Sequence, residues 1–359
     1  MSEVDKEIGE KIGEVRTESL DLSFGEIANL HDNKELFIQP EYQRLFRWSY
    51  GQRSRLIESI LLELPIPQIF VIENADGVLE LIDGLQRISS TIQFINSTQL
   101  DLEPLRLEGC DIIKSLNGKI FDELPLSLRL RLKRSSVRTV VIKRQSKSFL
   151  RYEMFKRLNT GGSYLSPQEI RNCSARMIGE NGKAFYEFIQ QMAASENSKA
   201  CIEPLPQTDL DQRGDEELVL RFFALKNYEA KFAGNVRDWL DSYMEDVLLE
   251  KEQFLSGQQA ASFSSLFDYL STVIGPGAFV RYRNAQPSGA LAPAYFEAVS
   301  MGVLNKIDDA KAKAPDRIKA AIINSLQSEP FRAVTGPGAN SKEKLRRRIE
   351  ILEAAIQAA

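Results

Sequence analysis

The sequence has very few of the residues on which metal and nucleophilic chemistry most often depend. It contains one histidine, His31, and three cysteines, Cys110, Cys173 and Cys201, which stand far apart. Zinc sites, Ser-His-Asp triads and HNH nucleases need histidines or closely spaced cysteines beside specific partners. The composition therefore argues against histidine-dependent nuclease chemistry, a zinc site and a disulfide framework. His31 lies in the polar stretch Leu-His-Asp-Asn-Lys, which is typical of a turn, so we expect a solvated loop residue there.

Long apolar runs are also missing. No stretch approaches the roughly 20 apolar residues that a membrane-spanning helix needs. The acidic N-terminus MSEVDKEIGEKIGEV lacks the apolar centre of a signal peptide. Together with the scarcity of cysteine, these absences predict a cytoplasmic protein without a membrane partner. The formal net charge of -4, from 46 Lys and Arg against 50 Asp and Glu, gives no overall attraction to nucleic acid, so such binding needs a local patch.

Two kinds of pattern divide the chain. Residues 1–20 are charged and weakly patterned, which predicts a flexible lead-in. The segments QIFVIE and VLELID, separated by Asn-Ala-Asp-Gly, predict a β-hairpin, and VRTVVIK predicts a further strand. We also expect a β-rich stretch at about 98–122. Beyond about residue 171 the pattern is helical, as in EELVLRFFALKNYEA, with turns at 256–264 and 275–278. This order predicts an α+β fold whose second part is mostly helical.

Two local patterns predict where helices begin. Ser49 precedes an amphipathic segment that ends before Pro65 and Pro67. Further along, Ser166-Pro167-Gln168-Glu169 combines a capping serine, a proline at the first helical position and a capping-box glutamate. We therefore expect helices to begin after Ser49 and after Ser166.

The loop Asp83-Gly84-Leu85-Gln86-Arg87 lies between a predicted strand and a predicted helix. Such a junction presents backbone N–H groups and the positive end of a helix dipole, which suit a phosphate. Gly84 permits close backbone approach, Arg87 can hold phosphate oxygens, and Gln86 can orient a water or a sugar. Asp83 can bind a divalent ion or act as a base. The pattern alone leaves open a second interpretation, in which Asp83 caps the helix and Arg87 is a surface charge.

Several motifs occur in the order and spacing of a known family. They are Pro-Glu-Tyr-Gln-Arg at 40–44 with Trp48, Leu-Ile-Glu-Ser-Ile at 56–60, Pro-Ile-Pro at 65–67, Asp-Gly-Leu-Gln-Arg at 83–87, and Phe-Lys-Arg-Leu-Asn-Thr-Gly-Gly at 155–162 running into Leu-Ser-Pro-Gln-Glu-Ile-Arg-Asn at 165–172. In these motifs the chain resembles the domain of unknown function 262 family, the GmrSD-type restriction endonuclease N-terminal domain. The resemblance covers roughly residues 20–175.

The resemblance implies a ParB/sulfiredoxin-like, nucleotide-binding domain at 21–175, followed by a helical domain at 176–359. Such domains bind a nucleoside triphosphate, often hydrolyse it, and tend to act in restriction systems directed at modified phage DNA. The family's Asp-Gly-Gln-Gln-Arg signature is linked to hydrolysis, and Asp83, Gly84, Gln86 and Arg87 match it. Leu85 replaces a glutamine of that signature. The replacement puts hydrolysis in doubt more than binding, unless residue 85 points inward.

The resemblance also implies companions for this loop. Arg44 would add a cation at the phosphates, while Asn159, Gly161 and Gly162 would contact the sugar or a phosphate, with Mg²⁺ held at Asp83. The same asparagine and glycines are equally suited to ending one helix and turning into the next. The aromatic Trp48 is more typical of packing against the following helix than of stacking on a base.

A run of basic residues without any acidic residue lies between positions 129 and 147. It contains Arg129, Arg131, Lys133, Arg134, Arg138, Lys143, Arg144 and Lys147. Such a run can follow a DNA backbone by releasing counterions, although charge runs more often form a solvated face. DNA is therefore one expected partner of this chain.

Three functions remain open from the sequence. The first is a Mg²⁺-dependent NTPase that acts as the sensor or regulatory subunit of an anti-phage or restriction system. Because His31 stands alone, that subunit would lack its own HNH nuclease and depend on a nuclease partner in trans. The second is a non-catalytic, nucleotide-gated DNA-binding or adaptor protein, which Leu85 favours slightly. The third, a stand-alone nuclease, lacks an evident carboxylate-lysine constellation.

Overall fold

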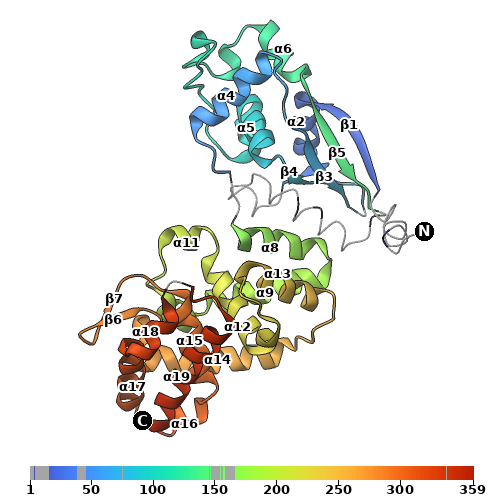
Figure 1. The fold of residues 1–359 in the computed structure, drawn as a ribbon. Coiled ribbons are helices and arrows are strands. Elements are labelled where there is room, and N and C mark those ends of the chain that lie inside the picture. The colour runs from blue at the N-terminus through green and yellow to red at the C-terminus, as the bar shows by residue number, and fades with distance from the viewer. Residues whose placement is uncertain are drawn as a thin grey trace. The chain divides into compact units, whose positions relative to one another are not determined.

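The structure is a computed structural model that describes residues 16–38, 46–74, 76–144, 166–336 and 338–359, together with Val4, Ser146, Met154 and Arg157. The chain forms two compact units, Met1–Ser163 and Tyr164–Ala359, which are described separately here (Figure 1). The first unit contains a sheet and helices, and the second is almost entirely helical. The α+β class predicted from the order of the sequence patterns is confirmed.

The described residues of the first unit form a five-stranded sheet in the order β1-β5-β3-β4-β2. The hairpin of β3 and β4 and the pair β1 and β5 are antiparallel, whereas β3 with β5 and β2 with β4 run parallel. The strands are β1 (Thr17–Ser23), β2 (Leu36–Phe37), β3 (Ile69–Glu73), β4 (Leu79–Asp83) and β5 (Ser136–Ile142). The predicted hairpin and the strand predicted from VRTVVIK are both confirmed.

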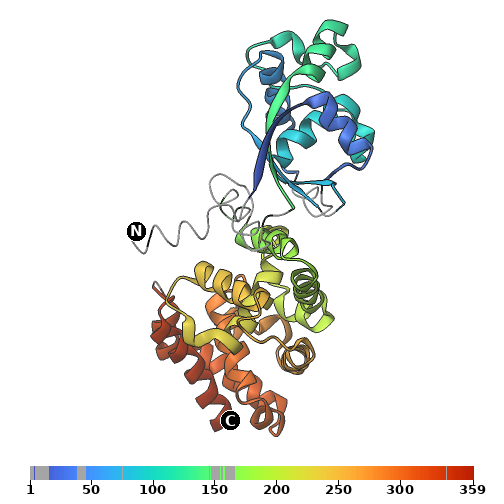
Figure 2. The same ribbon diagram turned by 90° about the vertical axis from the view of Figure 1, so that its right-hand side faces the viewer.

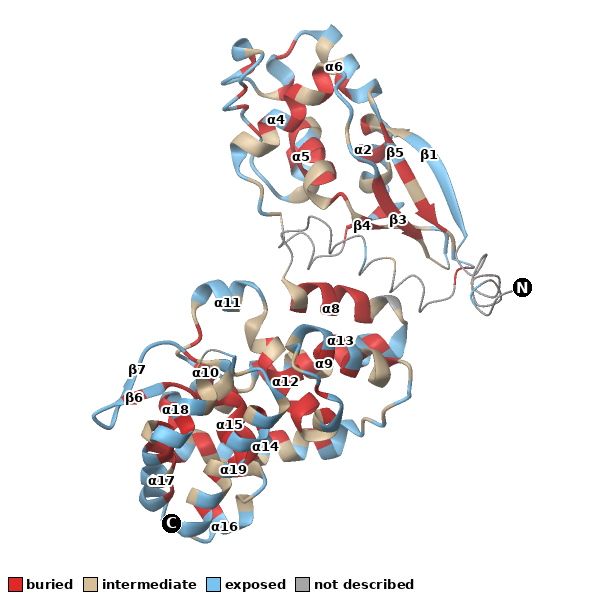
Figure 3. Cartoon of the chain, in the orientation of Figure 1, coloured by how far each residue is buried: buried red, intermediate tan, exposed pale blue. Residues whose placement is uncertain are grey.

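The helices of this unit are α2 (Phe24–Asp32), α4 (Tyr50–Leu61), α5 (Leu85–Asn96) and α6 (Leu126–Arg134) (Figures 1 and 2). Helix α2 contacts β1 and β2, α5 and α6 pack against α2, and α4 packs against α5 and α6. Helix α4 begins after Ser49 as predicted, and the structure shows a capping box there, in which the Ser49 side chain accepts from the Gln52 N–H at 3.3 Å. The apolar residues of α4 and α5 face inward, and β3 is buried over four of its five residues (Figure 3). The core of this unit therefore lies between the sheet and its helices.

Two expectations for this unit are wrong. The stretch 98–122 holds short 3₁₀ turns and irregular chain in place of strands. Side chains bind much of its backbone: the Glu58 carboxylate accepts from the N–H groups of Ile112 at 3.0 Å and Ile113 at 2.6 Å. His31 lies in the last turn of α2 and is half-buried, and burial lowers its pKa. It is therefore not a solvated turn residue.

The second unit is a bundle of helices with one short hairpin of β6 (Arg281–Arg283) and β7 (Gln286–Ser288). Its helices are α8 (Pro167–Met177), α9 (Glu180–Ala194), α10 (Glu196–Ile202), α11 (Gln207–Asp211), α12 (Gly214–Tyr228), α13 (Val236–Leu248), α14 (Ser256–Val273), α15 (Pro293–Leu304), α16 (Ile307–Lys311), α17 (Pro315–Gln327), α18 (Glu329–Thr335) and α19 (Lys342–Ala358). The capping box predicted at Ser166 is confirmed.

One prediction for the second unit is wrong: residues 256–264 begin helix α14 and do not form a turn. Serine, glycine and glutamine dominate this start, but Phe263, Leu266, Phe267 and Leu270 follow at helical spacing and are buried. Packing of that apolar face outweighs the weak local propensity of the first turns. Among the described residues, no helix is both long enough and apolar enough to span a membrane.

Candidate functional site

The junction between β4 and α5 depends on the backbone of Gly84. Strand β4 ends at Asp83, and Gly84 follows with φ 104° and ψ 10° in the left-handed region. Any other side chain would be strained there, and a Cβ at this position would collide with the Cγ2 methyl of Ile69 on β3. The tight approach of the junction to β3 therefore requires glycine at position 84.

Helix α5 begins without a side-chain cap. Its N-cap residue is Gly84, which makes no capping hydrogen bond, and the first helical bond runs from Ile88 N to Gly84 O at 2.9 Å. The interpretation in which Asp83 caps this helix is therefore wrong. The first-turn N–H groups and the positive end of the helix dipole lie at the loop, where they suit an anion.

Asp83 and Arg87 form an ion pair across the first turn of α5. The Arg87 Nη2 donates to Asp83 Oδ2 at 2.9 Å and to the carbonyl oxygen of Gln68 at 3.1 Å. The side chains of Arg87 and Asp83 are 19% and 33% exposed. The Arg87 Nε is buried and has no hydrogen-bond partner among the described residues. A guanidinium is thus held beside the loop with donor capacity left over.

Gln86 connects the loop to the segment before α4. Its Oε1 accepts from the backbone N–H groups of Arg47 at 3.2 Å and Trp48 at 3.0 Å. Gln86 is 39 positions from Arg47 and 38 positions from Trp48 in the sequence. Gln86 therefore positions the 46–49 segment, and a role in orienting a water or a sugar stays a prediction.

Arg53 completes this connection, and no local pattern in the sequence pointed to it. Its Nε donates to the Trp48 carbonyl oxygen at 2.8 Å and its Nη1 to Gln93 Oε1 at 3.0 Å. The guanidinium carbon lies 3.8 Å from the centre of the Phe46 ring. Burial lowers the pKa of Arg53. The residue ties α4, α5 and the 46–49 segment together beside the loop.

Several residues of the predicted nucleotide site, and one of the basic run, lie outside the described residues. They are Arg44, Asn159, Gly161, Gly162 and Lys147. Their roles therefore stay predictions. For a metal ion, the parts of the chain that the structure describes contain no group of three or more His, Cys, Asp or Glu side chains placed to hold one. A Mg²⁺ ion at Asp83 would depend on oxygens from a bound phosphate, as is common for this ion.

The basic residues at 129–144 lie on α6, on β5 and directly after β5. Four of them pair with carboxylates from other segments. The pairs are Arg129 with Asp122 (3.7 Å), Arg131 with Glu63 (3.9 Å), Arg138 with Asp21 (2.7 Å), and Lys143 with Glu18 (2.6 Å) and Glu73 (3.7 Å). Lys133 lies over the Phe121 ring at 5.5 Å. Arg134 is exposed and pairs with no carboxylate in the described part of the chain.

The motif at 166–172 belongs to the core of the helical unit. Arg171, whose side chain is 2% exposed, binds Asp241 on α13 at 2.7 Å and Glu217 on α12 at 3.1 Å. Arg221 continues the network, since it binds both Glu217, at 3.0 Å, and Glu297 on α15, at 2.8 Å. Burial raises the pKa of Glu217, but the charges of its two arginine partners outweigh burial and hold it below the ordinary value. The motif's arginine thus joins a buried ion network.

The first unit is therefore an α+β domain with a glycine junction, an ion pair and an uncapped helix start at one place. Residues 25–175 match the family model of the GmrSD restriction endonuclease, N-terminal domain. The family predicted from the ordered motifs is confirmed. The match indicates a component of a restriction or anti-phage system. No curated protein and no solved structure was found to match the chain.

Proposed function

We propose that the β4–α5 junction binds the phosphates of a nucleoside triphosphate, and that the protein is a nucleotide-dependent sensor or regulatory subunit of a restriction system. The observation that carries this proposal is the left-handed Gly84 at an uncapped helix start, with Arg87 held beside it. Helix N–H groups and a nearby guanidinium are the two kinds of donor that phosphate oxygens prefer.

Each residue of the loop has a separate task in this proposal. Gly84 lets a phosphate approach the backbone, and Arg87 donates to its oxygens through the nitrogen atoms that Asp83 and Gln68 do not use. Asp83 gives up part of its ion pair to hold Mg²⁺ together with phosphate oxygens. Gln86 keeps the 46–49 segment against the loop. When bound, the metal would neutralise charge on the phosphates.

Whether the bound nucleotide is hydrolysed depends on the residue at position 85. Leu85 is half-buried in the first turn of α5, where the family signature has glutamine. A leucine supplies no amide to hold an attacking water. We therefore expect the protein to bind nucleotide but to hydrolyse it slowly. Leu85→Gln should raise phosphate release while leaving nucleotide affinity within about twofold, because the substitution adds an amide without removing a phosphate contact.

Nucleotide binding is tested by titrating labelled NTPs with Mg²⁺ and following anisotropy, alongside phosphate release. Arg87→Ala should weaken binding by about 10- to 100-fold, the usual cost of one or two charge-assisted hydrogen bonds. Arg138→Ala is the control, because Arg138 also pairs closely with an aspartate of the same unit, Asp21, at 2.7 Å. Equal effects of the two substitutions, or no binding by the unaltered protein, would exclude the proposed site.

The second candidate is a nucleotide-gated adaptor without turnover, which would act on DNA or on a nuclease supplied in trans. The specific observation in its favour is the Asp83–Arg87 ion pair, which occupies the carboxylate that a metal would need. If the protein is such an adaptor, it binds nucleotide, and its rate of phosphate release equals that of the Asp83→Asn variant. A rate clearly above that of Asp83→Asn supports the NTPase instead.

A further inference from the structure

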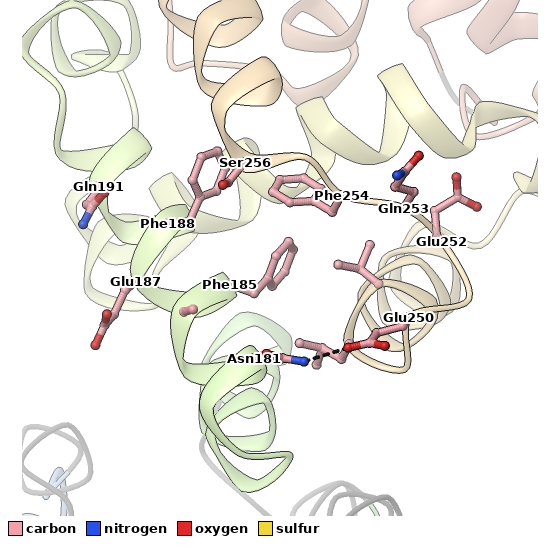
Figure 4. Close-up of a pocket in the computed structure, with 13 residues that line it drawn as sticks. Asn181, Phe185, Glu187, Phe188, Gln191, Glu250, Glu252, Gln253, Phe254 and Ser256 are labelled. Carbon is pink, nitrogen blue, oxygen red and sulfur yellow. Dashed lines mark hydrogen bonds between the residues drawn. The ribbon is translucent and has the colours of Figure 1, made fainter.

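The helical unit contains a cavity lined by phenylalanines and carboxylates. It has a volume of about 730 Å³ and lies between α9, the end of α13 and the 249–256 segment that leads into α14 (Figure 4). This volume is within the range of about 300–1,000 Å³ that binding pockets commonly have. The residues that line the cavity all belong to the second unit, whereas the β4–α5 junction belongs to the first.

Phenylalanine rings form the apolar part of this cavity. Phe254 contacts Phe185 and Phe188 edge to face, with ring centres 5.0 and 5.2 Å apart. A further edge-to-face contact with Phe223, at 5.4 Å, fixes the Phe254 ring from behind. Phe188 and Phe254 are only half-buried. The packed cluster therefore presents aromatic surface that the described residues leave uncovered, and its rings are held in place before any ligand arrives.

Three carboxylates line the cavity, and none of them has a basic partner among the described residues. Glu187, Glu250 and Glu252 line the cavity, and no lysine or arginine lines it. None of the three forms an ion pair with a basic residue in the described part of the chain, and the neighbouring Lys251 pairs with Asp246. Figure 4 shows Glu187 on the α9 side and Glu252 on the side of the 249–256 segment. Negative charge thus stands on both sides of an aromatic surface.

Apolar surface also continues beyond the cavity. Leu255, next to Phe254 and to the lining residue Ser256, is 45% exposed. A small molecule would be contained by the cavity and would leave this leucine in water. A polypeptide can place one side chain among the phenylalanines and cover Leu255 with the next part of its chain. The extent of the apolar surface therefore favours a peptide over a small cation.

We propose that this cavity, which we call the α9–α14 pocket, docks a basic peptide segment of a partner protein. One aromatic or aliphatic side chain of that segment enters between Phe188 and Phe254, and flanking lysines or arginines meet Glu187 and Glu252. A cation near the phenyl faces gains from their electron density as well as from the carboxylates. This proposal is independent of nucleotide binding at the β4–α5 junction.

The direct test titrates the full chain into fluorescein-labelled peptides and follows anisotropy in low salt. The probes are Gly-Lys-Lys-Phe-Lys-Lys-Gly, the same peptide with alanine for phenylalanine, and the same peptide with glutamate for lysine. The first should bind, the alanine peptide at least about fivefold more weakly, and the glutamate peptide not measurably. No binding of the first peptide at about 1 mM protein sites, or equal binding of the alanine peptide, overturns the proposal.

Variants locate the binding surface. Glu187→Gln and Glu252→Gln keep the side-chain shape and should each weaken binding about two- to fivefold, as expected for an exposed charge pair. Glu203→Gln is the matched control, because Glu203 is an exposed carboxylate of the same unit outside the pocket. Phe188→Leu should weaken the phenylalanine peptide but not the alanine peptide. If Glu203→Gln has the same effect as the pocket variants, the attraction is a general charge effect and the pocket is not the site.

Competition with a small aromatic cation tests whether the pocket binds a small organic cation in place of a peptide. Benzyltrimethylammonium, added as a competitor, should displace the labelled phenylalanine peptide only at millimolar concentration, because it cannot reach Leu255 or both carboxylates. Displacement at micromolar concentration would reassign the pocket to a small organic cation and overturn the peptide proposal. Circular dichroism of each variant confirms that the helical unit is folded in these titrations.

Discussion

Two features of the structure require glycine at position 84: its backbone is left-handed, and it lies very close to Ile69. We predict that Gly84→Ala destabilises the first unit by about 2–4 kcal/mol, since backbone strain and a steric clash add. Gly77→Ala is the control, because Gly77 is also left-handed, at φ 87°, but a Cβ there meets nothing within 4 Å. It should cost only about 1 kcal/mol.

The measurement uses urea unfolding with Trp48 as reporter. The chain has two tryptophans, and Trp48 lies in the first unit while Trp239 lies in the second. A Trp239→Phe background therefore reports the first unit alone. Nucleotide affinity should fall with Gly84→Ala and remain unchanged with Gly77→Ala. Similar losses of stability for both variants would mean that contact with Ile69 does not set the requirement for glycine.

Two buried cysteines give a prediction about pH. Burial, followed by the nearby carboxylates Glu58 and Asp111, raises the pKa of Cys110 to about 11, and burial raises that of Cys201 to about 12. Folded pKa values above the unfolded value of 9.0 mean that the stability linked to these thiols is present below pH 9 and is lost as pH rises toward 11–12.

At pH 8 the reactive thiolate of Cys110 should be about 100-fold scarcer than in the unfolded chain, from a pKa difference of about two units. Labelling with a thiol reagent should therefore be slow in the folded protein and fast in urea. Mass spectrometry of the labelled peptides identifies each cysteine. Rapid labelling of Cys110 or Cys201 in the folded protein would contradict the buried environment.

Among the helices, α8 shows most clearly what a local pattern can and cannot reveal. The capping box at Ser166 was predicted because its residues are neighbours in sequence. The burial of Arg171 was not, because its partners Glu217 and Asp241 lie 46 and 70 residues away. The motif could be matched to a family by sequence, but its physical role in the core required the fold.

The same distinction explains the rest of the fold and the site. The strand–loop–helix pattern at 79–96 was readable because alternation and helical spacing are local. The contact of Gln86 with Trp48, and the bridging role of Arg53, join distant segments and left no local pattern. The prediction of strands at 98–122 was wrong for a related reason. The Glu58 carboxylate on α4 accepts from backbone N–H groups of this stretch that would otherwise bind a neighbouring strand.

The buried network of α8 predicts a large cost for losing one charge. Arg171→Met should destabilise the second unit by about 3–5 kcal/mol, because the buried carboxylate of Asp241 would lose this guanidinium and Glu217 would lose one of its two arginine partners. Arg138→Met removes an exposed pair and should cost at most about 1 kcal/mol. Urea unfolding followed through Trp239 in a Trp48→Phe background reports this unit. A cost near that of the control would mean that the network contributes little to stability.

At the scale of the whole molecule, charge limits any binding of DNA. The net charge is -4, and the basic residues at 129–144 are mostly neutralised by carboxylates on neighbouring segments. Each such pair must open before its cation can meet a phosphate. Among the seven basic residues at 129–144, Arg134 is the exposed one for which the described part of the chain shows no partner.

This pairing sets a quantitative expectation for the salt dependence of binding. Seven phosphate contacts would give a slope of about -6 for log K against log salt, from about -0.9 per contact. We expect a slope between about -1 and -3, because few of these cations are available without breaking an ion pair. Anisotropy of a labelled 20-base-pair duplex, titrated between 25 and 200 mM KCl, measures this slope.

Two matched variants assign the slope to residues. Arg134→Ala should make it shallower by about one and weaken binding equally for all sequences, since a phosphate contact carries no base information. Arg138→Ala should leave the slope unchanged, because Asp21 already neutralises that guanidinium. A slope near -6 that both variants reduce would show that the ion pairs open on DNA, and the basic stretch would then act as one surface after all.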